Sequence, residues 1–137
     1  MAGVFLLEIV TPQRVVLSKE VEEVTAPGRD GEFGVLREHT PFITTLRPGR
    51  VVWKNGAESE TFVVDGGFAE VWPDRTNLLV NVAVRGEDVD TDRVKEDLKE
   101  AEEKLKALKE DDPEHRKAAE RVEFLRLQLE LAGGRLD

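Results

Sequence analysis

The chain has 137 residues, no cysteine and a formal net charge of −9 at pH 7. Its length suits one ordinary domain or one compact domain with a small appendage, and the lack of cysteine excludes disulfides, cysteine-based zinc sites and thiol nucleophiles. We expect no nucleic-acid partner and no direct membrane insertion, because phosphate is bound through clustered lysine and arginine and no run approaches the roughly 18 apolar residues of a membrane span.

The composition changes sharply near Gly86. Seven of the eight phenylalanine and tryptophan residues and five of the six prolines precede it, whereas charged residues, leucine and alanine dominate the sequence that follows. We therefore predict an α+β protein with a β-sandwich domain at residues 1–86 and a helical domain at residues 87–137.

Short apolar runs separated by glycine, proline and polar residues predict the strands of the first domain. The last run alternates, so that Leu78, Val80, Val82 and Val84 share one face. About eight to ten strands at this spacing are typical of an antiparallel sandwich or flattened barrel. Outside the segment 28–49, the predicted strands cover residues 4–10, 15–17, 21–24, 51–54, 61–64, 68–72 and 77–84.

Two turn signals join neighbouring strands. Asn55-Gly56 favours the two left-handed residues of a type I′ turn, although the polar or small residues 57–61 predict a loop longer than two residues. Residues 73–76, Pro-Asp-Arg-Thr, predict a second hairpin. Both signals favour antiparallel pairing of consecutive strands.

The stretch from Gly28 to Gly49 combines many turn formers with short apolar steps. Its glycines and prolines suit short strands joined by tight turns, because glycine accepts a positive φ and proline fixes φ. The stretch also holds His39, which could act as a general base beside Glu38. We interpret it instead as a turn residue before Pro41, held by a backbone group.

The sequence contains no convincing catalytic or metal-binding constellation. It has no nucleophile elbow, and the glycines at 28, 31 and 34 do not open a helix that could bind phosphate. The two histidines, His39 and His115, fall in different predicted domains, and the many carboxylates suit solvated helix faces. We therefore predict a non-enzymatic protein with no bound metal and no cofactor.

From Asp90 onward the apolar residues recur at helical spacing. Asp90 suits the N-cap of a first helix. The residues of its narrow apolar seam are Val94, Leu98, Ala101, Leu105 and Leu108. The second helix is predicted to start with Asp112 as N-cap and Pro113 in the first helical position, and to end at Gly133-Gly134. Its seam residues are Ala118, Val122, Leu125 and Leu129, with Phe124 and Leu127 widening the seam.

The two predicted helices, each about 20 residues long, form an antiparallel hairpin. Such a hairpin with narrow seams buries little apolar surface, so its own stability is marginal. We expect the hairpin to pack against the β-domain, to pack against a partner, or to move between these two positions. A fixed structural cap on the sandwich is the alternative.

Two groups of residues are candidates for protein interfaces. Trp53 and Trp72 lie in predicted strands, where they could be binding hot spots or core residues. The second helix carries a local basic tract on an otherwise acidic chain, and this tract suits either ordinary solvation or docking to an acidic partner. The basic tract consists of Arg116, Lys117, Arg121 and Arg126.

The sequence resembles the epsilon-subunit family of F-type ATP synthases, whose mitochondrial members are named delta. The family pattern Gly-Glu-x-Gly-x-Leu-x-x-His-x-Pro-x-x-Thr-x-Leu-x-Pro-Gly is matched by residues 31–49, and residues 64–71 resemble the family's Ser-Gly-Gly-Phe-x-Glu-Val segment with Asp65 in place of the small residue. The resemblance spans essentially the whole chain, including the helical hairpin.

This resemblance implies a non-catalytic rotor part at the foot of the central stalk, on the cytoplasmic face of the bacterial membrane. The sandwich would bind the gamma subunit near His39 and the c-subunit ring near Glu32, and so help to couple proton-driven rotation to ATP synthesis. An extended hairpin would inhibit hydrolysis, with the basic tract near the catalytic beta subunit of the alpha–beta head. The rival interpretation is a free-standing β-sandwich adaptor that uses its helical hairpin for protein–protein interaction.

Some members of this family bind ATP through an Ile/Leu-Asp-x-x-Arg-Ala motif. Asp90 and Arg93 match that motif, but Val94 replaces its alanine. Val84 stands where ATP-binding members have an acidic residue, and Glu100 where they have an arginine. The resemblance therefore implies, at most, weak binding of ATP as a regulatory ligand.

Overall fold

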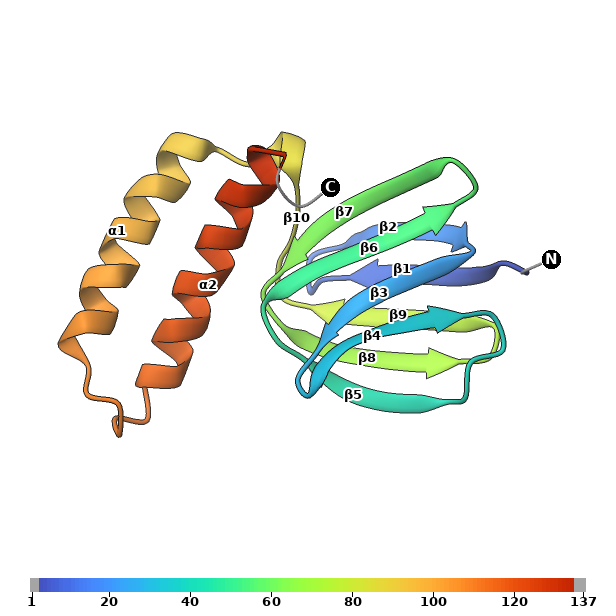
Figure 1. Cartoon of the computed structure of the whole chain (residues 1–137), viewed down its shortest axis with the longest axis horizontal. Coiled ribbons are helices and arrows are strands. Elements are labelled where there is room, and N and C mark those ends of the chain that lie inside the picture. Colours follow the sequence, from blue (N-terminus) through green and yellow to red (C-terminus); the bar gives the residue numbers. More distant parts are fainter. Residues whose placement is uncertain (1–2, 135–137) are drawn as a thin grey trace.

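The computed structural model describes residues 3–134, so residues 1–2 and 135–137 of the two predicted domains lie outside the described part. Ten strands precede one turn of 3-10 helix and two α-helices (Figure 1). The strands are β1 (Phe5–Val10), β2 (Val15–Val21), β3 (Glu23–Gly28), β4 (Gly31–Leu36), β5 (Phe42–Leu46), β6 (Gly49–Asn55), β7 (Glu58–Val64), β8 (Gly67–Trp72), β9 (Arg75–Val80) and β10 (Ala83–Arg85). The helical elements are η1 (Gly86–Asp88), α1 (Thr91–Ala107) and α2 (His115–Ala132).

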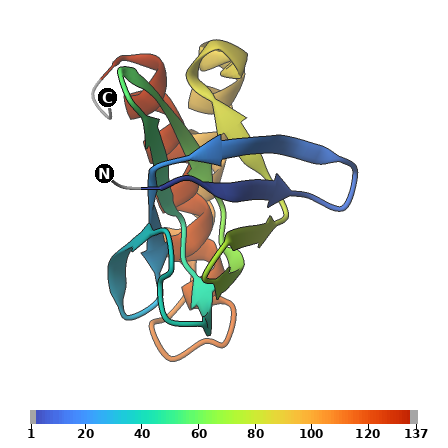
Figure 2. The same cartoon turned by 90° about the vertical axis from the view of Figure 1, so that its right-hand side faces the viewer.

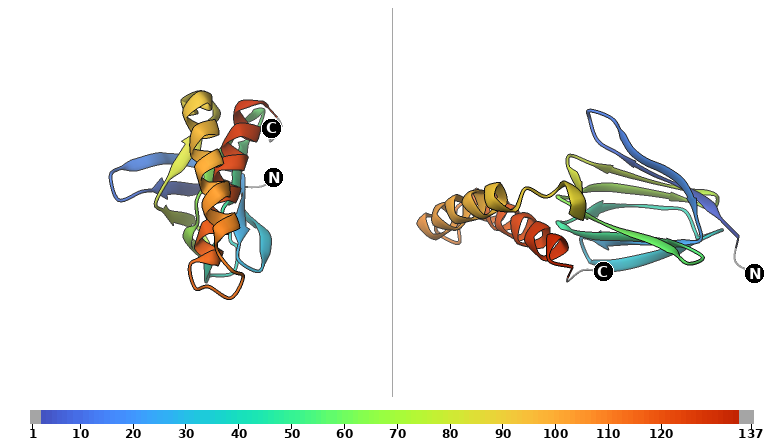
Figure 3. Two further views of the ribbon diagram at one scale, coloured as in Figure 1. Left: turned by 90° about the vertical axis from the view of Figure 1, so that its left-hand side faces the viewer. Right: turned by 90° about the horizontal axis from the view of Figure 1, so that it is seen from above.

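The strands form one connected sheet that folds over into two layers, seen from above in Figure 3. One layer has the order β10-β7-β6-β3 with β4 also paired to β3, and the other has the order β5-β8-β9-β1-β2. The pair Gly28↔Leu46 joins the layers. The predicted α+β fold with a largely antiparallel sandwich is confirmed, although β1 and β9 pair in parallel.

The core lies between the two layers and follows the alternation of the strands. In β1, Phe5, Leu7 and Ile9 are buried while the residues between them are partly exposed. In β9, Leu78 and Val80 are buried in the same way. Each fully buried side chain of this size contributes about 1.5–3 kcal/mol relative to exposure, so this core stabilises the sandwich.

One predicted strand division is wrong. The sequence predicts separate strands at residues 15–17 and 21–24, but β2 is continuous from Val15 to Val21. Its polar residues pair across to β1, for example Ser18 with Glu8 and Lys19 with Leu7. Pairing with a neighbouring strand therefore extends β2 through residues that lack an apolar pattern.

The predicted strand at residues 77–84 is also wrong, because it divides into β9 and β10 at Asn81 and Val82. The Asp65 carboxylate accepts a hydrogen bond from the Val82 N–H at 2.9 Å, and the Asp65 N–H donates to the Val82 carbonyl at 3.3 Å. These bonds take Val82 out of the β9 ladder and leave its side chain 42% exposed rather than in the core. The break also places Val84 beside Val63 on the outer face of the sheet, whereas Leu78 and Val80 lie in the core, so the four predicted residues do not share one face.

The turn between β6 and β7 is tighter than predicted. Asn55 pairs with Glu58, so the loop contains Gly56 and Ala57 alone. Gly56 has φ +60. Ala57 has a negative φ, because Glu38 is the only non-glycine residue with positive φ among residues 3–134. A positive φ at the first central residue alone is the pattern of a type II′ turn, not of the predicted type I′ turn. The polar residues after the turn belong to the exposed part of β7.

The start of α1 is confirmed and the start of α2 is not. The Asp90 carboxylate accepts a hydrogen bond from the Arg93 N–H at 3.2 Å, as expected of an N-cap. The predicted start of α2 at Pro113 is wrong, since the helix begins at His115. The Asp112 carboxylate accepts from the Glu114 N–H at 2.8 Å and closes a separate turn before the helix.

The helical hairpin stands beside one end of the sandwich, with α2 between α1 and the sheet (Figures 1 and 3). Gly133 and Gly134 follow the end of α2, and Gly134 has φ +78, as is common where a glycine ends a helix. None of the helices among residues 3–134 has the length and apolar character needed to span a membrane.

Candidate protein interaction surfaces

One face of α2 packs on the outside of the first sheet layer. Val63 is fully buried although its neighbours Phe62 and Val64 point into the sandwich core, because Phe124 and Leu131 of α2 cover it. Three consecutive buried residues are typical of a strand covered on both faces. We call this contact the α2 dock, and its members are Val63, Val84, Phe124, Leu127 and Leu131.

The α2 dock corrects the sequence interpretation of this helix. Phe124 and Leu127 are predicted to widen the seam between the helices, but they pack on the sandwich and give α2 a second apolar face. Beside the dock, Arg29 and Glu120 form an ion pair at 3.7 Å with side chains 39% and 34% exposed. Such a pair contributes about 0–1 kcal/mol, so the dock depends mainly on its few apolar contacts.

A second surface crosses the outside of the other layer. Strand pairing aligns Thr45 with Phe68, Phe68 with Leu79, Leu79 with Val10, and Val10 with Val15. We call these five residues, one from each strand of the layer, the cross-sheet row. Phe68, Leu79 and Val15 are 54%, 39% and 53% exposed. Contiguous exposed apolar side chains mark interaction sites more often than scattered ones do.

The surroundings of the cross-sheet row also suit an interface. Phe68 and Leu79 help to line a shallow hollow of about 330 Å³ together with Pro12 in the β1–β2 turn, and the β1–β2 hairpin projects from the body of the sandwich (Figure 2). The adjacent row is polar in four of the five strands, at Glu70, Asn77, Glu8 and Ser18, and ends in β5 at Ile43, which is 65% exposed. An apolar centre with a polar rim is typical of protein interfaces.

Glu32 and His39 lie at different ends of β4. Glu32 is exposed near the start of the strand and pairs with Pro27 of β3. His39 is exposed in the connection to β5, where its Nδ1 lies 2.7 Å from the Thr40 carbonyl and its ring centroid 5.2 Å from that of Phe42. The backbone contact agrees with the interpretation of His39 as a turn residue. Among residues 3–134 no cluster of acidic and histidine side chains could hold a metal ion.

The basic tract of α2 does not form one patch. Arg116 lies 3.8 Å from Glu120 in the same helix, and Arg126 bonds to Glu102 of α1 at 2.7 Å. Lys117 and Arg121 line a groove of about 340 Å³ between the helices. In this docked arrangement the four side chains therefore serve intramolecular contacts or the groove.

The two tryptophans have different environments. Trp53 is 5% exposed and belongs to the core, where its Nε1 donates a hydrogen bond to a Glu60 carboxylate oxygen at 3.1 Å. Trp72 is 44% exposed at the end of β8. Of the two candidates, Trp72 alone is available to a partner.

Comparison with known proteins gives a consistent result over most of the chain. The family described as "ATP synthase, Delta/Epsilon chain, beta-sandwich domain" matches residues 4–86. The ATP synthase epsilon chain of Anaeromyxobacter sp. (strain K) is 39% identical over 127 residues, covering 93% of this chain and 96% of that one. The epsilon chain of Desulfosudis oleivorans is 46% identical over 108 residues, covering 78% and 81%.

The chain belongs to the ATP synthase delta/epsilon family. Members named epsilon chain are non-catalytic subunits, which agrees with the prediction of a non-enzymatic protein. The fold also resembles a chain of the Euglena gracilis mitochondrial ATP synthase, solved as OSCP/F1/c-ring, with a TM-score of 0.77, 24% identity and coverage of 96% of this chain and 82% of that one. A chain of the Tetrahymena thermophila central stalk/c-ring structure has a TM-score of 0.65 at 18% identity, covering 93% and 96%.

In this epsilon-family chain, the residues that match the ATP motif make local contacts. The Asp90 carboxylate caps α1, and the Arg93 Nε lies 3.9 Å from Asp97. Val84 is part of the α2 dock, and Glu100 lines the groove between the helices. The groove therefore has the carboxylates of Asp97, Glu100 and Glu114 beside its three basic side chains, Lys104, Lys117 and Arg121.

Sequence reasoning missed the cross-sheet row and the α2 dock. Phe68, Leu79 and Val15 each belong to an ordinary strand pattern, and nothing local marks them as exposed. The three successive apolar residues at 62–64 were the available signal for the α2 dock, since a strand with one solvated face alternates.

Proposed function

We propose that this chain is the epsilon subunit of the central stalk of an ATP synthase, where its sandwich binds the gamma subunit and meets the c-subunit ring. The observation that carries this proposal is the cross-sheet row, an exposed apolar surface on a protein that belongs to the family. The row would bind gamma, with His39 at the edge of the contact, and Glu32 would face the ring. In this position the subunit helps to couple proton-driven rotation to ATP synthesis at the cytoplasmic face of the membrane, without entering the bilayer.

The helical hairpin is proposed to inhibit ATP hydrolysis by leaving the sandwich and reaching the catalytic beta subunit. Two features support this role. The α2 dock rests on few apolar contacts, and Val94 is the one buried residue of α1. Two arrangements of the hairpin can therefore differ by a few kcal/mol, as a switching element requires. Undocking would also free the basic tract, Arg116, Lys117, Arg121 and Arg126, for acidic groups of the head.

Replacing Phe68 by serine is expected to weaken binding of the chain to purified gamma subunit about thirtyfold. An exposed aromatic at the centre of an interface can contribute about 2 kcal/mol, which corresponds to this factor. Titration calorimetry measures the two dissociation constants. Val82→Ser is the control, since Val82 is similarly exposed but lies outside the cross-sheet row.

Equal weakening by both substitutions would show that the cross-sheet row is not the gamma contact.

The broader proposal, that the chain is a subunit of the synthase, has a separate test. A tagged chain should co-purify with gamma and the catalytic head from the membranes of its own cells, and its absence from that complex would leave the adaptor interpretation in place.

ATP is expected to bind the isolated chain weakly, with a dissociation constant above about 1 mM. Glu100 places a negative charge in the groove, and Asp90 and Arg93 are engaged at the start of α1. Titration calorimetry of the wild-type chain and of Glu100→Arg checks this, because the substitution should tighten binding. Glu103→Arg, at an exposed position of the same helix, controls for net charge. Micromolar binding to the wild-type chain would contradict the expectation.

A further inference from the structure

The short strand β10 connects the sandwich to the hairpin. It has three residues, pairs with β7 alone along its length, and forms one end of the connected sheet. Its central residue, Val84, is part of the α2 dock. A strand this short at a sheet edge has few hydrogen bonds to hold it, so the position of Val84 depends on other contacts.

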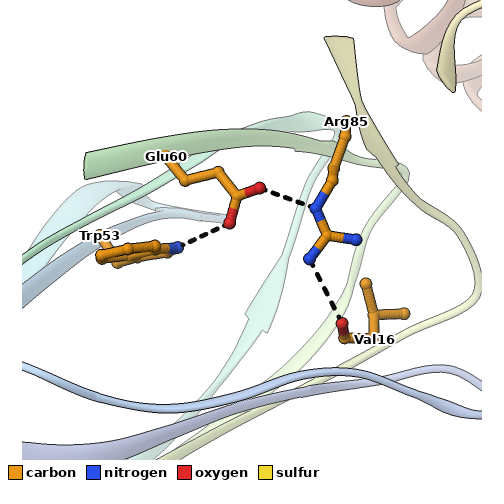
Figure 4. Close-up of polar contacts among 4 residues, drawn as sticks. All are labelled: Val16, Trp53, Glu60 and Arg85. Atoms are coloured by element: carbon orange, nitrogen blue, oxygen red, sulfur yellow. Dashed lines mark hydrogen bonds and ion pairs between the residues drawn. The ribbon is translucent and has the colours of Figure 1, made fainter. Parts of the chain in front are cut away.

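Arg85, the last residue of β10, makes those contacts (Figure 4). Its Nε donates to a Glu60 carboxylate oxygen at 2.7 Å, and the other oxygen of Glu60 accepts from Trp53 Nε1 at 3.1 Å. Its guanidinium lies 4.7 Å from the centre of the Phe62 ring, and a terminal nitrogen reaches the Val16 carbonyl at 3.5 Å. The Arg85 and Glu60 side chains are 25% and 29% exposed.

These contacts lie where the two end strands of the sheet, β10 and β2, approach each other. The order of the strands begins with β10 and ends with β2, and the bond from Arg85 to Val16 crosses from one to the other. Successive residues of a strand point to opposite faces, so Arg85 points toward β2 while Val84 faces α2. The next residue, Gly86, lies against Leu131, since a Cβ built on it would be 3.5 Å from the Leu131 Cγ.

We propose that the Glu60–Arg85 ion pair holds β10 in place and thereby keeps the α2 dock formed, so that movement of the hairpin begins after Arg85. This inference rests on the proposed two-state hairpin and names the contact that sets the balance between its states. Loss of the ion pair would loosen β10, displace Val84 and favour the undocked hairpin. Glu60 and Arg85 are positioning residues, since neither is a member of the α2 dock and Arg85 bonds to Glu60 and Val16.

Thiol labelling of the full chain tests the proposal directly. The sequence has no cysteine, so Val63→Cys places one thiol beneath α2, where reagent reaches it when the hairpin leaves. Ala69→Cys, in a second version of the chain, places a thiol in the sandwich core, where it reacts when the whole domain unfolds. When docking is fast relative to labelling, the rate at each site is proportional to the open fraction.

Glu60→Gln keeps the size of the side chain and removes its charge. We expect it to raise the labelling rate at position 63 about fivefold and to leave the rate at position 69 unchanged, because a hydrogen bond to a charged group is stronger than a neutral one. Arg85→Lys should raise the rate at position 63 as well. Glu58→Gln is the matched control on the same strand, since Glu58 is 70% exposed and lies 3.9 Å from Lys19, and it should change neither rate.

Two results would overturn the proposal. One is an unchanged rate at position 63 in Glu60→Gln. The other is an equal rise at positions 63 and 69, because the ion pair would then stabilise the sandwich as a whole. Neither result depends on ATPase activity, so the inhibitory role of the hairpin is tested separately by hydrolysis assays on the assembled enzyme.

Discussion

Removal of residues 87–137 is expected to raise the ATP hydrolysis rate of the assembled synthase at least about fivefold while assembly and ATP synthesis persist. A regulatory coupling of 1–3 kcal/mol corresponds to factors of about 5 or more. The cross-sheet row, Glu32 and His39 all remain in the shortened chain, so its contacts with gamma and the ring should be kept. The measurement is the ATPase rate of membranes that contain either the full or the shortened chain.

A hairpin that is cross-linked to the sandwich in its docked position, called the pinned hairpin here, tests whether faster hydrolysis comes from loss of inhibition or from damage to the sandwich. Removing α2 uncovers Val63, which could perturb the sheet. In the full chain, Arg29→Cys and Glu120→Cys can be joined by a short cleavable cross-linker, because the native side chains meet at 3.7 Å. The pinned enzyme should hydrolyse ATP as fast as the shortened one, and cleavage of the linker should restore the slower rate. A slow rate in both the pinned and the shortened enzyme excludes inhibition by the hairpin.

Gly67→Ala is expected to lower the free energy of unfolding of the sandwich by about 3–5 kcal/mol, which is among the largest effects of single substitutions. Gly67 has φ +136 at the start of β8, and a Cβ there would lie 2.0 Å from the Leu79 carbonyl oxygen and 3.0 Å from the Val80 Cα. Both are backbone atoms of the paired strand β9, so they cannot move without breaking the ladder. Urea unfolding followed by circular dichroism measures the change.

Gly31→Ala isolates the cost of the backbone conformation from the cost of the steric clash. Gly31 has a closely similar φ of +142, but a Cβ there would meet no atom within 4 Å. We expect a loss of about 1–3 kcal/mol from the strained φ alone. If the two variants lose equal stability, the close approach of the Leu79 carbonyl oxygen to Gly67 adds no cost, and the predicted steric effect of Gly67→Ala is wrong.

Local patterns predicted most elements of the fold. The change of composition at Gly86, the alternation of Leu78 and Val80, and the cap at Asp90 all involve residues close in sequence, and the structure has an element at each place. The errors at Ser18 and Val82 arose where distant partners decided the outcome, namely pairing with β1 and the Asp65 hydrogen bonds.

The candidate surfaces could be predicted in part. Glu32 and His39 were identified from their place in the family pattern, and their contacts with the ring and gamma stay predictions. The cross-sheet row could not be found, because it depends on the register of five strands between residues 10 and 79. The ion pair of Glu60 with Arg85 also joins residues 25 positions apart.

The sequence by itself determined the division into a β-sandwich and a helical hairpin and the membership of the ATP synthase delta/epsilon family. Hydrophobic periodicity and turn residues act over a few neighbours, so they are readable along the chain. The tertiary structure alone decided that Val63 is covered by α2 while Phe68 and Leu79 stay exposed. Burial depends on which distant segment packs against a face. The run at 62–64 indicates a strand covered on both faces but does not say that α2 is the cover, and nothing local separates the exposed Phe68 and Leu79 from buried strand residues.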